Sequence, residues 1–371
     1  MVLIGKYIAF KNTNRFGDFI EEIESVNREG YDFLYVTNES FSDEDKENFF
    51  HNMIEIAALC EKDVYAEFPL THFEDMKKLY YANVKKIVAS SKTTLTDEVI
   101  NDGMTRFGKD LIVKESDFKK IVSSNANVEN AVSDSFVIFD TDEKIDVYSV
   151  KEALNQKGFE TKSLKCEIPW SDLKKNSDGL VPVIVVDYKS DKILMMAYMN
   201  EEAYVNTFKT GLMNYYSRSR NSQWIKGETS GHFQYVKYMK ADCDKDTLLA
   251  GVSQIGVACH TGSDTCFFND VLKSSSAEKN PSKILTDLYK VVEDRKVNPK
   301  EGSYTNYLFD KGLDKILKKV GEEACEIVIA SKNEEPKEIK YEIADFLYHL
   351  SVLMVEKGVT WEEVADELAK R

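Results

Sequence analysis

Three aspartates and one cysteine lie within six residues of the chain, in the stretch ADCDKD at positions 241 to 246. If the stretch is extended, side chains two apart share a face, so Asp242, Asp244 and Asp246 point one way and Cys243 the other. Like charges on one face repel each other unless a cation lies between them. Carboxylate oxygens suit magnesium, which often bridges to a substrate phosphate. The stretch predicts a magnesium site, with a solvated acidic turn as the alternative.

Two further cysteines follow in ACHTGSDTC, where Cys259 and Cys266 flank His260. With Cys243 they provide three soft ligands, which suit zinc and leave a fourth position for water. Zinc lowers the pKa of bound water to about 7, so hydroxide becomes available at neutral pH. His260, next to one ligand, is placed to move a proton. We therefore expect a catalytic zinc site.

Polar and basic residues precede this region in SRSRNSQWIKGETSG, positions 217 to 231. Arginine and lysine bind phosphate, and the amides of a glycine-bounded turn bind anions. A tryptophan here either stacks on a base or fills the core. The predicted substrate-binding residues are Arg218, Arg220, Trp224, Lys226, Glu228, Thr229 and Ser230.

Acidic residues recur in two segments with helical spacing near the C-terminus. Glu322 and Glu326 lie four apart in KKVGEEACEIVIA, and Glu342 and Asp345 lie three apart in EIKYEIADFLYHL, so each pair shares a helix face. Facing acids inside a bundle are costly to bury without cations between them. These four residues are predicted magnesium ligands, and Glu322, Glu323 and Glu326 are predicted catalytic residues. A solvated helix face is the alternative for either helix alone.

The elements that position these residues fall into three regions. Short apolar runs alternate with amphipathic segments in the first third, which indicates a mainly parallel sheet with helices. A strand-rich region starts near Pro169, and the chain is helical in pattern from Lys283 onward. We expect domains at 1–162, 163–275 and 280–371, with a polar linker at 273–282. The predicted fold classes are a partial barrel of α/β type, a β-rich α+β domain and an all-α bundle.

The middle region resembles phosphoribosyl-AMP cyclohydrolase of histidine biosynthesis over about residues 168–270. The resemblance rests on GLVPVIVVD, LMMAYMN, YYSRSR, WIKGETSG, ADCDKD and the CH…C group, which occur in this order. It implies hydrolytic opening of the adenine ring between N1 and C6. It also implies a homodimer whose zinc ligands come from both chains.

The last region resembles phosphoribosyl-ATP pyrophosphatase, an all-helical enzyme. GSYTNYLFDKG matches that family's polar turn at Ser303, Tyr304 and Thr305, and Lys318 and Lys319 match the basic pair before its acids. The implied reaction splits phosphoribosyl-ATP into phosphoribosyl-AMP and pyrophosphate. Because that product is the substrate of the middle region, the two resemblances support each other. His349, past the acids, is expected to be a core or surface histidine.

Residues 63–114 resemble part of the half-barrel of the isomerase and cyclase of the same pathway, on FEDMKKLYYANVKKIVASS and FGKDLIV. Where those enzymes carry a glycine-rich phosphate loop, this chain has EFPLTHFED, and where they carry an acid on the first strand it has YIAFKN. This chain thus lacks both the phosphate-binding loop and the acidic residue of those enzymes. We therefore expect a catalytically silent domain that docks against a partner chain or against the other domains.

Composition narrows the function classes. The net charge of −15 opposes non-specific binding to nucleic acid or to anionic membranes. The sequence contains no apolar run of about 20 residues and its first residues lack a secretory pattern, so a cytoplasmic protein is expected. Cys60, Cys166 and Cys325 have no cysteine neighbours and are expected to be structural.

Two other functions fit parts of the sequence. One is a zinc nucleoside deaminase fused to a pyrophosphatase that clears unwanted nucleotides, although the separation of Cys259 and Cys266 does not fit the deaminase signature. The other is a structural zinc site with a helical dimerisation module and no catalysis. That alternative leaves the row of three aspartates unexplained.

Overall fold

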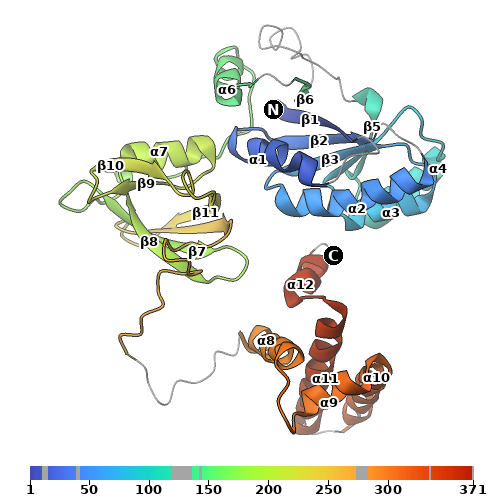
Figure 1. Ribbon diagram of the computed structural model, residues 1–371. Coiled ribbons are helices and arrows are strands. Elements are labelled where there is room, and N and C mark those ends of the chain that lie inside the picture. Colours follow the sequence, from blue (N-terminus) through green and yellow to red (C-terminus); the bar gives the residue numbers. More distant parts are fainter. Residues whose placement is uncertain are drawn as a thin grey trace. The chain divides into compact units, whose positions relative to one another are not determined.

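The structure is a computed structural model of the chain and describes residues 1–10, 16–38, 42–117, 136–141, 144–272, 283–333 and 336–369 (Figure 1). The chain divides into two compact units, Met1–Asn269 and Asp270–Arg371. In the described ranges we find no helix with the length and apolar character needed to cross a membrane. The predicted linker at 273–282 lies outside the described residues.

A six-stranded parallel sheet forms the first part of the larger unit and curls into a half-barrel. The strand order is β5-β4-β3-β2-β1-β6, so the first strand lies inside the sheet. This agrees with the prediction of a partial barrel, because a closed barrel of this type has eight strands. The strands are β1 (Leu3–Phe10), β2 (Phe33–Asn38), β3 (Asp63–Phe68), β4 (Lys86–Ala89), β5 (Ile112–Lys114) and β6 (Phe136–Phe139).

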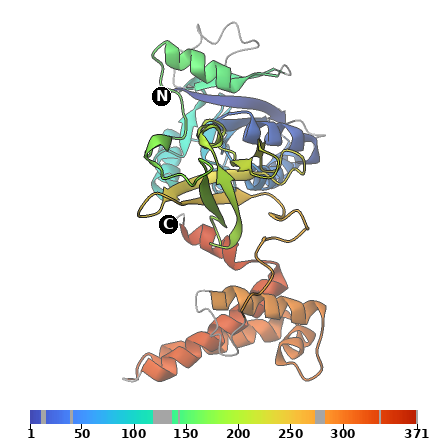
Figure 2. The same ribbon diagram turned by 90° about the vertical axis from the view of Figure 1, so that its left-hand side faces the viewer.

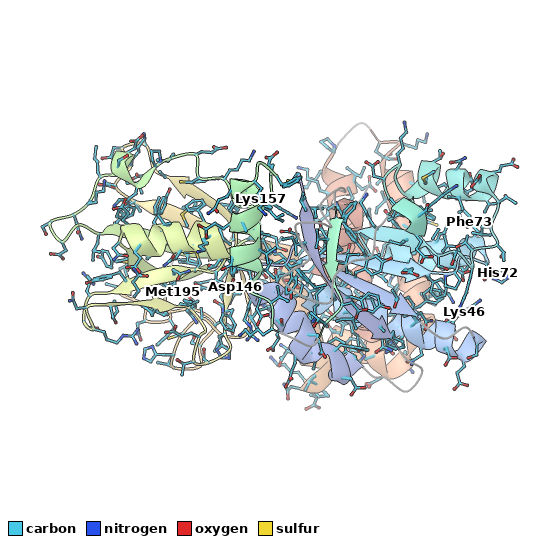
Figure 3. The ribbon with its side chains drawn as sticks, turned by 90° about the horizontal axis from the view of Figure 1, so that it is seen from above. Lys46, His72, Phe73, Asp146, Lys157 and Met195 are labelled. Atoms are coloured by element: carbon cyan, nitrogen blue, oxygen red, sulfur yellow. The ribbon has the colours of Figure 1, made fainter. Side chains whose placement is uncertain are left out.

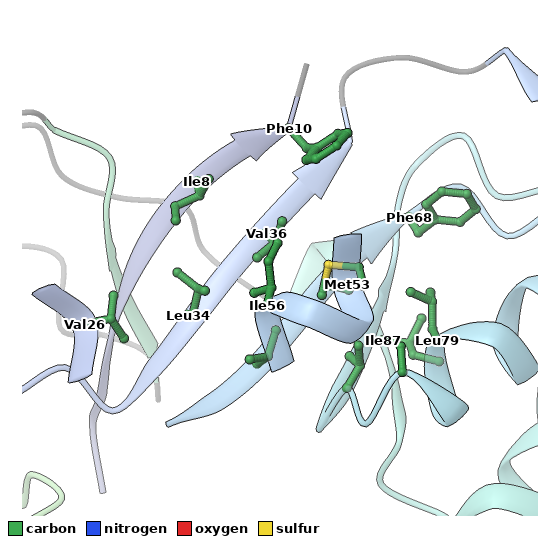
Figure 4. Packing of buried hydrophobic residues seen from close by; sticks show 14 of the residues in the cluster. Ile8, Phe10, Val26, Leu34, Val36, Met53, Ile56, Phe68, Leu79 and Ile87 are labelled. Carbon is green, nitrogen blue, oxygen red and sulfur yellow. The ribbon is translucent and has the colours of Figure 1, made fainter. Parts of the chain in front are cut away.

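Helices cover one face of this sheet, because alternate strand residues point to that side. Figure 4 shows Leu34 and Val36 of β2 packed with Met53 and Ile56 of the following helix. Asp146 and Lys157, labelled in Figure 3, cap the two ends of α6. The helices are α1 (Ile20–Arg28), α2 (Asp43–Leu59), α3 (Phe73–Tyr81), α4 (Asp97–Phe107) and α6 (Val147–Gln156), with short 3-10 turns at Phe16–Phe19 and Glu115–Asp117.

Aromatic side chains fill the concave face of the half-barrel. The rings of Phe33 and Tyr65 stack with centroids 4.5 Å apart, and Phe136 meets Phe33 edge-on at 6.0 Å. The Tyr35 hydroxyl donates to Glu67 at 2.7 Å. These side chains form a hydrophobic cluster of their own on this face of the sheet.

The rest of the larger unit contains a second, four-stranded sheet in the order β11-β12-β7-β8 and a two-stranded ribbon of β9 and β10. The strands of the sheet pair antiparallel except for β12 and β7. Asn200 caps the helix α7, and Gly211 ends it in the left-handed conformation. The elements are β7 (Val181–Asp187), β8 (Ile193–Met199), α7 (Glu201–Thr210), β9 (Asn214–Ser217), β10 (Ser222–Ile225), β11 (Gln234–Ala241) and β12 (Leu248–Gln254), with a 3-10 turn at Trp170–Asp172.

The smaller unit is helical throughout its described residues, as Figure 2 shows for the segment coloured orange to red. Helices α10 and α11 pack side by side, and the core consists of Val292, Leu308, Ile316, Val352 and Val355. The helices are α8 (Ile284–Val297), α9 (Tyr304–Lys311), α10 (Leu313–Ala330), α11 (Pro336–Lys357) and α12 (Trp361–Ala369).

Candidate active sites

The three aspartates of the ADCDKD stretch lie together on an exposed turn between β11 and β12. One carboxylate oxygen from each of Asp242, Asp244 and Asp246 lies within 4.8 Å of the other two. The expectation of a strand here is wrong, because β11 ends at Ala241 and Lys245 has a φ of 62°. A left-handed residue turns the chain back, so the carboxylates gather on a turn and not along a strand face.

Amide hydrogen bonds hold this turn in shape. Asp242 Oδ1 accepts from the amides of Asp246 (3.0 Å) and Thr247 (3.2 Å). Desolvation raises the pKa of Asp242, but these hydrogen bonds together outweigh it and leave the pKa below its ordinary value. Lys174 Nζ lies 3.3 Å from Asp244. Three carboxylate oxygens within 4.8 Å of one another match the ligand set of a hard divalent cation.

The thiols of Cys259 and Cys266 lie close together at the end of the second sheet. A hydrogen bond from Thr261 lowers the pKa of Cys259, whose sulfur lies 3.1 Å from Thr261 Oγ1. Burial and the neighbouring Cys259 raise the pKa of Cys266. His260 is exposed, with Nδ1 4.0 Å from the Cys259 sulfur. The pair offers two soft ligands with a titratable side chain beside them.

Cys243 is exposed on the aspartate turn and does not join this pair. Among the described residues, no group of three ligating side chains contains Cys259 and Cys266. One copy of the chain therefore supplies two of the three predicted thiols at one point and the third elsewhere.

Arg218 and Arg220 are exposed, and each lies over an aromatic ring. The Arg218 guanidinium is 4.0 Å from the Tyr198 ring centroid, and that of Arg220 is 5.8 Å from Trp224. Trp224 is half-buried on β10 and lies against Tyr215 of β9, with centroids 5.0 Å apart. The predicted glycine-bounded turn lies further along, at 227–231, and Arg218 and Arg220 lie on the turn that joins the two strands of the ribbon β9 and β10. Trp224 packs against the core, and the two arginines remain accessible.

The next segment is a tight loop, residues 226–232, which joins β10 to β11. Lys226 is only 7% exposed, and its Nζ donates to the carbonyl of His232 at 3.2 Å. Burial lowers the pKa of Lys226, while the sulfurs of Cys266 and Cys259 act in the opposite direction. Glu228, Thr229 and Ser230 are exposed at the tip. The structure thus brings the buried lysine of the loop next to the thiol pair.

In the helical unit, acidic side chains of α10 and α11 converge. Oxygens of Glu323, Glu326 and Glu342 lie within 4.8 Å of one another. Burial, followed by the charges of Glu326, Glu323 and Asp345, raises the pKa of Glu342. Mutual repulsion of this kind is relieved by a bound cation, so the geometry fits magnesium.

The membership of this cluster differs from the sequence-based expectation. Glu323 occupies the position expected for Glu322, which instead pairs with Lys319 Nζ (2.9 Å) and Lys318 Nζ (3.5 Å). The hydrogen bond with Lys319 lowers the pKa of Glu322. Asp345 is exposed and stays outside the group of three, although its charge reaches Glu342. Adjacent helix residues point about 100° apart, so only one of the two glutamates faces α11.

His349 is buried beside this cluster, whereas the sequence had indicated only a core or surface histidine. Its Nδ1 donates to the carbonyl of Asp345 at 2.9 Å and lies 3.5 Å from Glu323 Oε1. Its Nε2 lies 3.3 Å from the Tyr304 hydroxyl. Helical spacing was a usable signal, because residues four and seven positions after Asp345 and Glu342 share their face.

The start of α9 faces the same histidine and its neighbour. Ser303 caps the helix by accepting from the amide of Asn306 at 3.4 Å, and the Thr305 hydroxyl lies 2.7 Å from that of Tyr348. Tyr304 contacts His349. The structure therefore brings the predicted polar turn to the edge of the acidic cluster, and Lys319 also joins it through Glu323 at 3.1 Å.

Two family models match the regions that contain these sites. The model described as phosphoribosyl-AMP cyclohydrolase matches residues 195–268, and the model described as phosphoribosyl-ATP pyrophosphohydrolase matches residues 285–371. The histidine biosynthesis bifunctional protein HisIE of Thermoanaerobacter pseudethanolicus is 51% identical over 209 residues, which cover 97% of that protein and 53% of this chain. The chain belongs to the bifunctional HisIE family.

Other HisIE proteins agree with this assignment. The HisIE of Caldanaerobacter subterraneus is 51% identical, and the match covers 96% of that protein. The HisIE of Bacillus subtilis is 48% identical, and the match covers 95% of that protein. Each match covers 54% of this chain. The chain is therefore a bifunctional enzyme of histidine biosynthesis with phosphoribosyl-AMP cyclohydrolase and phosphoribosyl-ATP pyrophosphohydrolase activities. Both activities were predicted from the sequence and are confirmed, against the deaminase and the non-catalytic alternatives.

The half-barrel lies outside both HisIE family matches. A mandelate racemase/muconate lactonizing protein from Paracoccus denitrificans aligns with 43% of this chain and 46% of its own, at 7% identity and a TM-score of 0.26. That likeness is too low to carry an argument. The half-barrel is an addition to the part of the chain that is similar to other HisIE proteins.

Proposed function

We propose that each HisIE activity resides in one of the sites described above. The helical domain, 280–371, would release pyrophosphate, and the middle domain, 163–275, would open the adenine ring of the product. The half-barrel domain, 1–162, would carry no reaction of its own. The division is supported by where the ligand side chains converge. The pyrophosphohydrolase match contains the group of three glutamates, and the cyclohydrolase match contains the three aspartates and two neighbouring thiols of the predicted three.

For the first reaction, the carboxylates of Glu323, Glu326 and Glu342 would hold magnesium, with Asp345 beside them. Magnesium, when bound, supplies positive charge for the phosphate oxygens of phosphoribosyl-ATP and orients water. Glu326, exposed at the cluster, would accept the proton of the attacking water. Ser303, Tyr304 and Thr305, together with Lys318 and Lys319, would bind the nucleotide, and Glu322 would hold the two lysines in place.

For the second reaction, Cys259 and Cys266 would hold zinc together with Cys243 of another copy. Two adjacent thiols fit zinc by their softness, and zinc, when bound, supplies water with a pKa of about 7. His260 would take the proton from the water that adds to C6 and return it to N1 as the N1–C6 bond opens. Arg218, Arg220, Lys226 and the tip residues Glu228, Thr229 and Ser230 would bind phosphoribosyl-AMP. Asp242, Asp244 and Asp246 would hold magnesium.

We propose a homodimer because one copy leaves the thiol set incomplete. Cys243 is exposed on its turn and available to a second chain. A twofold axis repeats any such contribution, so two equivalent sites would form in a dimer.

One assay tests both assignments. The full chain is supplied with phosphoribosyl-ATP, magnesium and zinc, and pyrophosphate release and the absorbance change of ring opening are followed together. We expect Cys259→Ala to abolish ring opening alone and Glu326→Ala to reduce chiefly pyrophosphate release. Loss of both reactions in either folded variant would contradict the division of labour.

A further inference from the structure

One contact between the half-barrel and the second sheet is made by the partly buried Glu61. Glu61 lies just before β3 and its side chain is 14% exposed. Its Oε2 accepts from Lys237 Nζ of β11 and its Oε1 from Ser253 Oγ of β12, both at 2.6 Å. Its own amide donates to Asn27 Oδ1 at 2.7 Å. Glu61 is therefore fixed within the half-barrel and ties two strands of the other sheet to it.

A second contact lies next to the first. The Arg28 guanidinium, at the end of α1, lies 5.2 Å from the centroid of the Phe233 ring. The Tyr148 hydroxyl donates to the carbonyl of Arg28 at 2.9 Å. The same hydroxyl lies 3.3 Å from the carbonyl of Thr210. A cation over an aromatic ring is attracted by the negative face of the ring, more strongly when it is shielded from water. Arg28 is thus held in place from its own side while it covers Phe233.

Phe233 closes the 226–232 loop. A Cβ added to Gly227 would lie 2.4 Å from the Phe233 amide nitrogen, so the two ends of the loop touch and Gly227, at φ +95°, has no room for a side chain. The Ile255 amide donates to the carbonyl of Phe233 at 2.9 Å. Lys226 donates to His232, the residue before Phe233. A side chain that fixes Phe233 therefore also limits the motion of the loop.

We infer that the half-barrel clamps the cyclohydrolase domain through Arg28 and Glu61 and thereby holds the 226–232 loop in the conformation that binds substrate. Arg28 and Glu61 are positioning residues and touch no substrate. The inference rests on the proposed role of Lys226 and the loop tip in binding phosphoribosyl-AMP. The half-barrel would then have a function without catalysing a reaction of its own. A loop that is already ordered binds substrate more tightly, because binding does not have to supply the free energy of ordering it.

The test combines hydrogen exchange with kinetics on the full chain. Arg28→Met keeps the aliphatic stem and removes the guanidinium, and Glu61→Ala removes both contacts to the second sheet. Glu74→Ala is the matched control, because Glu74 is exposed on the same domain and pairs only with Lys77 in the described structure. For the two clamp variants we expect faster amide exchange in residues 226–234 and a KM for ring opening raised about three- to tenfold, with kcat within about twofold.

The readouts separate the clamp from the proposed substrate site. Arg28→Lys, which keeps the cation, should recover most of the lost affinity. Unchanged exchange in 226–234 in both folded variants would overturn the clamp. Faster exchange with an unchanged KM would overturn the link to substrate binding and, with it, the assignment of the loop as a substrate-binding element. Pyrophosphate release should not change in any of these variants.

Discussion

His349 Nδ1 lies 3.5 Å from Glu323 Oε1, and both side chains are almost fully buried, at 7% and 5% exposed. The histidine also reaches Tyr304 and the carbonyl of Asp345. It therefore links the acidic cluster to the start of α9, where the nucleotide is proposed to bind.

The first prediction concerns this histidine. His349→Ala should slow pyrophosphate release about 10- to 100-fold, because residues that orient metal ligands typically matter by that amount. His349→Asn places an amide where Nδ1 lies and should recover part of the rate by donating to Asp345. The rate is measured against magnesium concentration. An unaltered magnesium dependence in His349→Ala would contradict the role of the histidine in positioning Glu323.

The second prediction compares adjacent glutamates. Glu323→Gln should reduce pyrophosphate release on the order of 100-fold, because Glu323 lies in the cluster with Glu326 and Glu342. Glu322→Gln should cost less than about fivefold, because that side chain is 38% exposed and pairs with two lysines. Steady-state rates at saturating magnesium provide the comparison. Equal losses in the two variants would contradict the assignment of Glu323, rather than Glu322, to the magnesium-binding cluster.

The third prediction tests whether two chains share each zinc site. Cys243→Ala and Cys259→Ala should each abolish ring opening when expressed alone. Random co-assembly of the two variants makes half of the dimers mixed, and each mixed dimer regains one of its two sites. Ring opening should therefore return to about a quarter of the wild-type rate. No recovery in proven mixed dimers would mean that the three thiols come from one chain.

The fourth prediction concerns a lysine of the half-barrel. Burial, followed by the charge of Lys151, lowers the pKa of Lys62 below its ordinary value. The unfolded chain then binds more protons than the folded chain between the lowered and the ordinary pKa, so the free energy of unfolding rises with pH across that window. Lys62→Met should flatten this rise and increase the free energy of unfolding at pH 7 by about 1 kcal/mol. Denaturant unfolding at several pH values measures both effects, with the exposed Lys85→Met as the control.

Local pattern was enough to predict much of this protein. Short apolar runs predicted the strands of the first sheet and a strand-rich pattern those of the second, while helical spacing predicted the helices of the C-terminal unit. These patterns depend on residues close in sequence. The acidic stretch at Asp242, Asp244 and Asp246 gathers three carboxylates as expected, although on a turn and not a strand. The motifs also predicted both reactions, which the family matches confirm.

Other features depend on which surfaces meet, and the sequence alone did not determine them. Sequence alone does not show which of Glu322 and Glu323 faces the neighbouring helix. The packing of α10 against α11 places Glu323 on that side. His349 lies beside Glu323 because α11 packs against α10, and α9 brings Tyr304 to the same histidine across 45 residues. Glu61 meets Lys237 across 176 residues and Ser253 across 192. Such contacts follow from the fold as a whole, since no periodicity connects residues so far apart, and only the tertiary structure could decide them.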